Sequence, residues 1–105
     1  MSTVYAAAVL TNPQKKYLRK LGHEIEPIVR IGKEGLTDGV VHLTKTGLLA
    51  HELIKAKVNT NSDQDRDDVF EALASAAEAQ LVFTIGRVGL LYKPHPEKPV
   101  IVLPR

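Results

Sequence analysis

Apolar residues first recur at helical spacing near the N-terminus. Leu18 and Leu21 lie three positions apart, and Tyr17, four before Leu21, joins them on one face of a predicted helix. Thr11-Asn12-Pro13 is typical of a helix start, and Gly22 is typical of a helix end. Four cations fall largely on the opposite face of this helix: Lys15, Lys16, Arg19 and Lys20.

Two later segments alternate between apolar and other residues with the period of a β-strand. In residues 27–31, Val29 and Ile31 share one face, and Ile28 and Arg30 share the other. In residues 53–58, the first face holds Ile54, Ala56 and Val58, and the second holds Leu53, Lys55 and Lys57. We therefore expect this second strand to turn one face to the core and a basic face to the other side.

Two further helices are predicted around these strands. One covers residues 38–50 and is capped by Thr37 or Asp38. Its expected inward residues are Val40, Leu43 and either Gly47 or Ala50. The other helix covers residues 63–80, begins with acidic residues that suit the helix dipole, and has four inward positions: Val69, Leu73, Ala76 and Ala77.

The last part of the chain predicts a hairpin followed by an extended tail. Residues 81–85 and 88–93 read as strands, with Gly86-Arg87 at the bend. Four prolines in residues 94–104 predict an extended tail, in which residues 100–103 could add a short edge strand. The element order is therefore α-β-α-β-α-β-β, which predicts a single compact α/β domain with a mixed four-stranded sheet and helices packed on it.

A Gly-x-x-Gly loop, Gly32-Lys33-Glu34-Gly35, joins the first strand to the second helix. Glycines let a backbone approach a ligand closely, and a helix start directs unpaired N–H groups and a positive dipole end towards it. Phosphate suits these features together with the Lys33 cation, and KH-type RNA-binding modules hold nucleotide backbones with a loop of this form. Many strand-to-helix turns also need two glycines, so the loop alone is equally typical of a structural turn.

Charge is distributed unevenly along the 105 residues, although the net charge is only +2. Residues 12–57 hold nine cations and five anions (+4), residues 58–80 one cation and six anions (−5), and residues 81–105 four cations and one anion (+3). We expect one face to attract polyanions and another to repel them. The absence of cysteine excludes disulfides and thiolate metal sites and fits a reducing cytosol, and no apolar run approaches the length of a membrane span.

No pattern in the sequence is typical of catalysis or of cofactor binding. The four histidines are not clustered as a metal site would require, and the acidic run at residues 63–68 lacks the glycine and terminal glutamate of a calcium-binding loop. The three serines lack the flanking glycines of a nucleophile elbow, and the P-loop and dinucleotide fingerprints are missing. We predict a non-enzymatic protein with no metal and no cofactor.

Three sequence blocks at residues 18–23, 27–37 and 51–57 carry a family resemblance. They read Leu-Arg-Lys-Leu-Gly-His, Pro-Ile-Val-Arg-Ile-Gly-Lys-Glu-Gly-Leu-Thr and His-Glu-Leu-Ile-Lys-Ala-Lys. In this order and at these separations they resemble the CRM domain (chloroplast RNA splicing and ribosome maturation), most closely its stand-alone bacterial YhbY-like members. Gly86, residues 90–93 and residues 103–105 also fit. The resemblance assigns residues 10–105 to the domain and leaves residues 1–9 as a loose leader.

The resemblance implies a fold like the C-terminal domain of translation initiation factor three. It also implies RNA binding, with rRNA in precursors of the large ribosomal subunit as the partner of a cytoplasmic protein. We expect a monomer that binds no membrane. By resemblance, the RNA-binding residues are the loop and a basic surface: Lys15, Lys16, Arg19, Lys20, Arg30, Gly32, Lys33, Glu34, Gly35, Lys55 and Lys57.

Five aromatic residues are too few, and too typical of a core, to predict a platform for stacked bases. This favours recognition of the backbone and shape of structured RNA over recognition of unstacked bases. Two other interpretations stay open. One is an adaptor that docks on a ribosomal protein or an assembly factor, and the other is a DNA-binding KH-like module. Binding of naked RNA would exclude the first, and strong competition by duplex DNA would favour the second.

Overall fold

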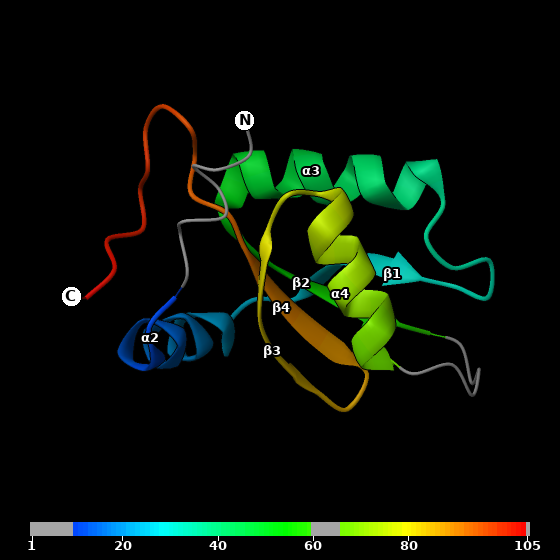
Figure 1. Cartoon of the computed structure of the whole chain (residues 1–105), viewed down its shortest axis with the longest axis horizontal. Coiled ribbons are helices and arrows are strands. Elements are labelled where there is room, and N and C mark those ends of the chain that lie inside the picture. Colours follow the sequence, from blue (N-terminus) through cyan, green and yellow to red (C-terminus); the bar gives the residue numbers. More distant parts are fainter. Residues whose placement is uncertain (1–9, 60–65, 105) are drawn as a thin grey trace.

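Three helices and four strands follow one another in residues 10–59 and 66–104, the part of the chain that this computed structural model describes (Figure 1). The expected leader, the first residues of the expected third helix and Arg105 lie outside these residues. The helices are α2 (Asn12–Gly22), α3 (Asp38–His51) and α4 (Arg66–Ala76). The strands are β1 (Pro27–Ile31), β2 (Leu53–Val58), β3 (Gln80–Ile85) and β4 (Val88–Tyr92).

The four described strands form one sheet in the order β1-β2-β4-β3. β1 and β2 are parallel, and α3 supplies the crossover that a parallel pair requires. β2 pairs with β4, and β4 with β3, in antiparallel fashion. The β3–β4 hairpin turns at Gly86, whose φ of 58° favours glycine. The predicted α/β domain with a mixed four-stranded sheet is therefore confirmed.

Helices α3 and α4 pack on one face of the sheet and enclose the main core (Figure 1). Phe70 and Leu73 of α4 and Leu48 of α3 are fully buried in it. The strand residues that meet them are Val29, Ile31, Ile54, Ala56, Val58 and Leu91. The inward positions predicted for Val29 and Ile31 and for the apolar side of β2 are thus confirmed, because their alternation matches the pleat of the sheet. The face predicted for Ile28 is wrong, since β1 is irregular between Pro27 and Val29 and the Ile28 side chain lies against Gly47 of α3.

Helix α2 packs on the opposite face and encloses a second, smaller core around Leu18 and Leu90. Gly22 is not left-handed; a Cβ atom there would lie 2.9 Å from Leu90 Cδ1, so glycine allows the end of α2 to approach β4 closely. Leu53 is only 6% exposed in this core. The prediction of one core face and one basic face on β2 is therefore wrong at Leu53. Only Lys55 and Lys57, further along the strand, are partly exposed there.

The inward face of α3 differs from the prediction by one position. Leu43 is 47% exposed and Ala50 is also exposed, whereas Thr44 and Leu48 are buried together with Gly47. The sequence pattern missed Thr44 because it is polar. Its hydroxyl donates a 2.8 Å hydrogen bond to the carbonyl oxygen of Val40, so burial leaves no polar atom unsatisfied.

Helix α4 ends at Ala76, not at Gln80 as predicted. Glu78 adopts a left-handed conformation (φ 56°), and the N–H of Glu78 donates to Ser75 O at 3.1 Å. The N–H of Ala79 donates to Ala74 O at 2.8 Å, which completes a Schellman-type helix end. Of the predicted inward positions of this helix, Ala76 is exposed, and Ala74 is buried in its place. This end was missed because glutamate, not glycine, occupies the left-handed position.

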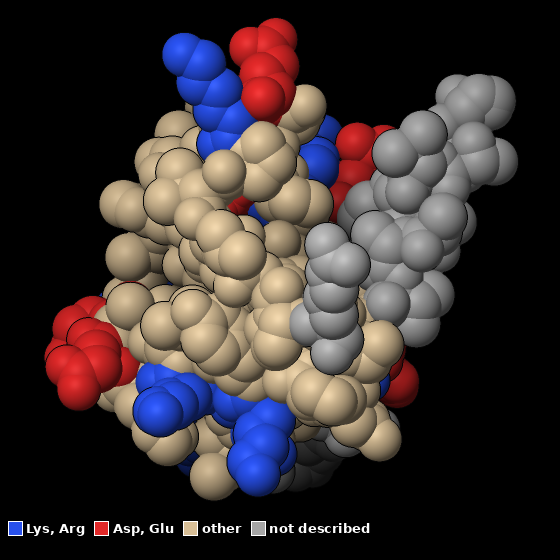
Figure 2. Space-filling model, turned by 90° about the vertical axis from the view of Figure 1, so that its left-hand side faces the viewer, with Lys and Arg blue, Asp and Glu red and all other residues tan. Residues whose placement is uncertain are grey.

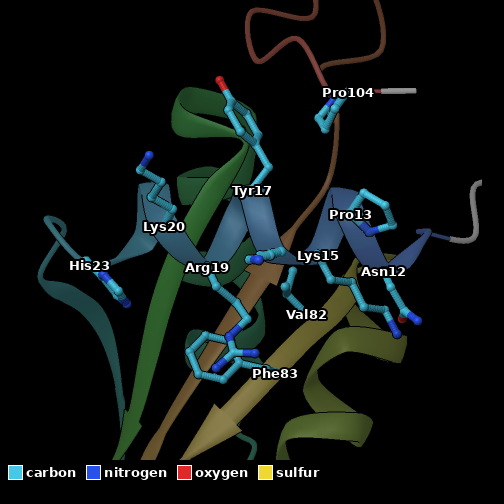
Figure 3. Close-up of a pocket in the computed structure, with 11 residues that line it drawn as sticks. Asn12, Pro13, Lys15, Tyr17, Arg19, Lys20, His23, Val82, Phe83 and Pro104 are labelled. Atoms are coloured by element: carbon cyan, nitrogen blue, oxygen red, sulfur yellow. The ribbon is translucent and has the colours of Figure 1, made fainter.

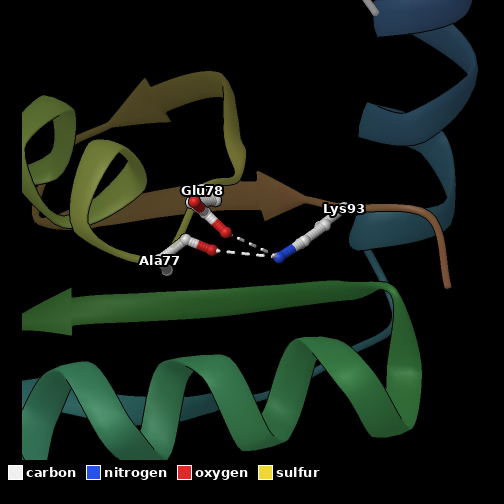
Figure 4. Close-up of polar contacts among 3 residues, drawn as sticks. All are labelled: Ala77, Glu78 and Lys93. Carbon is white, nitrogen blue, oxygen red and sulfur yellow. Dashed lines mark hydrogen bonds and ion pairs between the residues drawn. The ribbon is translucent and has the colours of Figure 1, made fainter. Parts of the chain in front are cut away.

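Lys93, which directly follows β4, supports this strained helix end (Figure 4). Its Nζ donates to the carbonyl oxygen of Ala77 at 3.5 Å and lies 3.7 Å from Oε1 of Glu78. The ion pair is largely exposed, so its contribution to stability is small. The backbone conformation of Glu78 affects stability more, since a left-handed residue with a Cβ atom costs roughly 1–2 kcal/mol.

We expect Glu78→Gly to raise the free energy of unfolding by about 0.5–1 kcal/mol, because glycine removes the left-handed strain while the weak ion pair is lost. Urea unfolding followed by circular dichroism measures this change. Glu71→Gly, in the middle of α4, is the matched control and should lower stability by about 1 kcal/mol. Equal destabilisation by both substitutions would contradict the assignment of strain to Glu78.

The C-terminal tail, residues 93–104, runs back over the α2 side without forming the edge strand considered for residues 100–103. Ile101 and Leu103 pack against the second core, while Val100 and Val102 are about 80% exposed. The tail backbone is held by side chains instead of by a neighbouring strand. Gln14 Nε2 of α2 donates to Pro104 O at 3.0 Å, and the other anchor is Glu52.

Glu52 is a buried carboxylate (3% exposed) at the end of α3, and its φ of 66° turns the chain into β2. It accepts hydrogen bonds from the backbone N–H groups of His95 (2.6 Å), Val100 (3.0 Å) and Ile101 (2.8 Å). Burial alone would raise the pKa of Glu52, but these three donors and the nearby His95 imidazole outweigh burial and hold the pKa below its ordinary value of 4.5. Glu52 is therefore an ionised anchor for the tail.

Candidate nucleic-acid interface

The Gly-x-x-Gly loop forms a tight turn between β1 and α3. The N–H of Gly35 donates to Gly32 O at 3.0 Å, which places Lys33 and Glu34 at the exposed tip. Gly35 has a φ of 74°, so a residue with a Cβ atom would be strained there. Thr37 then caps α3, because its hydroxyl accepts a 3.2 Å hydrogen bond from the N–H of Val40. Of the two predicted caps, Thr37 is the one observed.

Gly32 differs from Gly35 because the fold itself does not require a glycine at this position. Its φ lies outside the left-handed region, and a Cβ atom built on it would meet nothing within 4 Å among the described residues. Gly39, in the first turn of α3, is similarly unconstrained, with only Thr37 Oγ1 at 3.8 Å. Among the described residues, none accepts from the N–H of Asp38 or of Gly39. The loop and the helix start therefore offer an open backbone surface.

Three cations on the sheet lie beside this loop on the α2 side. Arg30, two residues before Gly32, is directly opposite Lys57 on the neighbouring parallel strand. Lys55 lies two residues before Lys57 in β2, and its side chain is on the same face of the sheet. Arg30 is exposed and both lysines are partly exposed. We call Arg30, Lys55 and Lys57 the basic strip.

The α2 cations lie at the other end of the molecule from the loop. Figure 1 places α2 and the β1–α3 loop at opposite ends of the longest dimension, which measures 38 Å. Seen from the α2 end, Lys and Arg side chains gather low on the face, where α2 lies (Figure 2). The structure therefore brings the predicted residues together in two groups. One is the loop with the basic strip, and the other is α2, with the open part of the sheet between them.

A groove of about 860 Å³ runs along α2 where the helix meets β3 (Figure 3). All its charged lining residues are cations: Lys15, Lys16, Arg19 and Lys20, with His23 at the end of the helix. Arg19 reaches from α2 to Phe83 of β3, and its Cζ atom lies 4.5 Å from the ring centroid. The sequence grouped Phe83 with the core aromatics. Phe70 and Tyr92 are indeed buried, but Phe83 is partly exposed in the groove.

Groups typical of metal or membrane sites are not found in the described residues. In residues 10–59 and 66–104, no three or more His, Cys, Asp or Glu side chains come together as metal ligands would. No helix in this part of the chain is both long and apolar enough to cross a membrane. The charged residues that line the groove along α2 and that form the basic strip are cations, and the start of α3 presents backbone N–H groups. These features define a class, a small α/β domain with a glycine-bounded turn and a basic face.

Comparison with known proteins identifies the family within this class. The CRS1 / YhbY (CRM) domain matches residues 10–93, and the chain belongs to this family, as its sequence blocks predicted. Bacillus subtilis "Probable RNA-binding protein YqeI" is 42% identical over 96 residues, covering 91% of this chain and 100% of that protein. A Haemophilus influenzae protein named "RNA-binding protein" is 38% identical over 96 residues, covering 91% and 96%.

The fold comparison agrees with the sequence comparison. The solution structure of a hypothetical protein from Staphylococcus aureus matches with a TM-score of 0.78 and 38% sequence identity. The match covers 91% of this chain and 100% of that one. The likeness therefore includes nearly all of the described domain and is not confined to the loop.

Proposed function

We propose that this chain is a non-enzymatic RNA-binding protein that docks on structured RNA through the Gly-x-x-Gly loop and the basic face. Its relatives from Bacillus subtilis and Haemophilus influenzae carry RNA-binding names, which supports the general function. The finer proposal is that the RNA is rRNA in precursors of the large ribosomal subunit, bound by a cytoplasmic monomer. The family resemblance supports this finer step.

The observation that carries the proposal is the open glycine at position 32. Neither packing nor backbone conformation calls for glycine there, yet the residue stands at the turn between the basic strip and the start of α3. A missing side chain at an exposed turn lets another backbone come close. The N–H groups of Asp38 and Gly39 lie in the first turn beyond, where the helix dipole favours a negative charge. A phosphate group satisfies these features.

In the proposed mechanism, the loop and the start of α3 hold one phosphate, and Lys33 at the tip neutralises its charge. Arg30 and Lys57, side by side on parallel strands, hold the neighbouring phosphates. Glu34 and Asp38 place two carboxylates near the loop, so charge alone does not make this the strongest anion site. The loop instead fixes position through its backbone, while the basic strip and the α2 cations supply most of the attraction.

Gly32→Ala tests the role of the loop separately from the stability of the fold. We expect the affinity for structured 23S-type rRNA fragments to fall about tenfold, because the methyl group blocks close approach of the phosphate. The free energy of unfolding should stay equal or rise by about 0.4–1 kcal/mol, since the added methyl group meets no described atom and restricts the unfolded chain. Filter binding and urea unfolding measure the two quantities.

Ser75→Thr is the matched control, since it adds a methyl group on the exposed part of α4, across the sheet from the basic strip. It should leave RNA affinity unchanged. If Gly32→Ala binds rRNA fragments as tightly as the natural chain, the turn is only structural and the loop mechanism is wrong. If the natural chain binds no naked RNA at all, the RNA-binding proposal fails, and docking on a protein partner becomes the better account.

A further inference from the structure

We infer that the groove along α2 binds a single unpaired nucleotide, whose base stacks on the Arg19 guanidinium while the α2 lysines hold its phosphates. This inference rests on the proposed RNA-binding function and deepens it. It makes the preferred target a paired RNA stem that carries an unpaired nucleotide. The loop and the basic strip contact the stem, and the α2 groove contacts the nucleotide that leaves it.

The geometry of Arg19 and Phe83 is the first support. The Arg19 Cζ atom lies 4.5 Å from the centroid of the Phe83 ring, so the ring supports the guanidinium from below (Figure 3). Arg19 is exposed on its other side, and no carboxylate pairs with it among the described residues. A supported guanidinium with one open face is a surface on which a nucleobase can stack, as bases do on Arg planes in RNA complexes.

A bulge in β3 is the second, independent support. The β3–β4 register shifts between Leu81 and Phe83, and both Val82 and Phe83 pack towards the α2 side as a result. In a regular strand, neighbouring side chains point to opposite faces. Val82 fills the second core, so the bulge leaves the Phe83 ring partly exposed beneath Arg19. Bulges that redirect one side chain are frequent next to functional sites.

The composition and size of the groove fit a nucleotide. Lys15, Lys16 and Lys20 line the same groove as the Arg19–Phe83 pair, and the lining contains no Asp or Glu. A small inorganic anion would need the charges but not the planar pair. The groove volume of about 860 Å³ also lies within the range of small-molecule sites, which suits a ligand with a base as well as a phosphate.

The groove also lies in line with the basic strip. Phe83 pairs across the sheet with Leu90, and Leu90 pairs in turn with Lys55 of β2. Leu90 itself is buried under the end of α2, so an RNA that contacts Arg30, Lys57 and Lys55 reaches Arg19 by passing over this helix. The basic strip and the groove thus lie on the same side of the sheet, where one RNA can contact both.

Two hairpin RNAs test the inference, one fully paired and one identical except for a single bulged 2-aminopurine. The natural chain should bind the bulged RNA about tenfold more tightly, which is the size expected for one stacked base, and the 2-aminopurine fluorescence should be quenched on binding. Arg19→Lys keeps the charge but removes the plane, and Phe83→Leu removes its support. Both should bring the ratio of the two affinities to about one and abolish the quenching, with folding checked by circular dichroism.

Lys57→Gln, in the basic strip, is the matched control. It should weaken both RNAs by the same factor and leave the ratio at about ten, because the basic strip contacts the stem that both RNAs share. A ratio near one for the natural chain, with tight binding of both RNAs, would overturn the nucleotide site and leave the proposed function standing. A ratio of ten that persists in Arg19→Lys would also overturn it. Failure to bind either RNA would overturn both proposals.

Free adenosine monophosphate distinguishes a nucleotide within RNA from a soluble nucleotide. We expect millimolar nucleotide to displace the bulged RNA only weakly, because the site takes its ligand as part of a larger electrostatic contact. Tight binding of the free nucleotide that is lost in Arg19→Lys would show a site for soluble nucleotides and would overturn the assignment to RNA.

Discussion

Glu52→Gln should lower the free energy of unfolding at pH 7 by about 2–3 kcal/mol, the largest stability effect that the structure predicts for an isosteric change. Glu52 accepts three backbone hydrogen bonds from the tail, at 2.6, 2.8 and 3.0 Å. A glutamine amide can accept through only one oxygen, and its NH₂ group would face a backbone donor. At least one partly buried N–H group then loses its acceptor, and the charge that strengthens the other bonds is gone.

The same substitution should remove the part of the pH dependence of the free energy of unfolding that Glu52 causes. The pKa of Glu52 is lowered in the folded protein, so its stabilising contribution is complete above the ordinary pKa of 4.5 and is lost as the pH falls through the folded value. The difference in stability between the natural chain and Glu52→Gln should therefore be constant from pH 7 down to about 5 and shrink below that.

Urea unfolding curves at pH 7, 5 and 3.5, followed by circular dichroism, measure both effects. Glu71→Gln serves as the control, since Glu71 is exposed on α4 and should change stability by no more than about 0.5 kcal/mol. Equal stability of the natural chain and Glu52→Gln at pH 7 would mean that the tail is not anchored as described. A difference that persists unchanged at pH 3.5 would assign the effect to shape instead of charge.

RNA affinity should fall about 250-fold between 50 and 200 mM monovalent salt, the largest functional effect expected. About five phosphate contacts, each contributing a log–log slope of roughly −0.7 to −0.9, give a slope near −4. The available cations are exposed or partly exposed on the loop, the basic strip and α2. Filter binding with a structured 23S-type rRNA fragment at several salt concentrations measures the slope.

Removing two of these contacts should change the slope by a known amount. Arg30→Gln combined with Lys57→Gln deletes an adjacent pair on the sheet, so the slope should become less steep by about 1.4–1.8. Lys45→Gln, on the exposed side of α3 across the sheet, is the matched control and should leave the slope unchanged. A slope near zero in the natural chain would contradict electrostatic docking, and an equal effect of Lys45→Gln would contradict its localisation to the basic face.

Local patterns predicted the elements of this fold well where their causes are local. The start of α2 at Thr11 follows from a capping box with Gln14, and the shared inward face of Val29 and Ile31 follows from the pleat. The bend at Gly86 follows from a residue that tolerates positive φ. In each case the residues that cause the structure are adjacent in the sequence, so a single sequence contains the whole signal.

The errors arise where the burial or the hydrogen-bond partners of a residue depend on a distant segment of the chain. Leu53 is buried because α2, more than thirty positions earlier, covers its end of β2. Glu52 was not considered as a site because its partners, residues 95–101, follow more than forty positions later. The exposed Phe83 depends on a register shift between two strands, which alternation alone does not reveal.

In the candidate site too, features with local causes could be predicted, and features that depend on distant segments could not. The loop, its glycines and the cations of each element could be read from the sequence, but their arrangement could not. The sequence did not indicate that the α2 cations and the loop lie at opposite ends, or that the basic strip occupies the sheet between them. It also could not separate Gly35, which the backbone conformation requires, from Gly32, which it does not. The contact of these residues with RNA stays a prediction.

The anchoring of the tail by Glu52 has a practical consequence for where this domain should be cut. The family match ends at residue 93, and a chain truncated there would keep every described helix and strand. It would also leave the buried carboxylate without its three donors and uncover the apolar surface under Ile101 and Leu103. The minimal folding unit is therefore longer than the region that defines the family. Expression boundaries or fused tags placed before residue 104 should yield a less stable, aggregation-prone product.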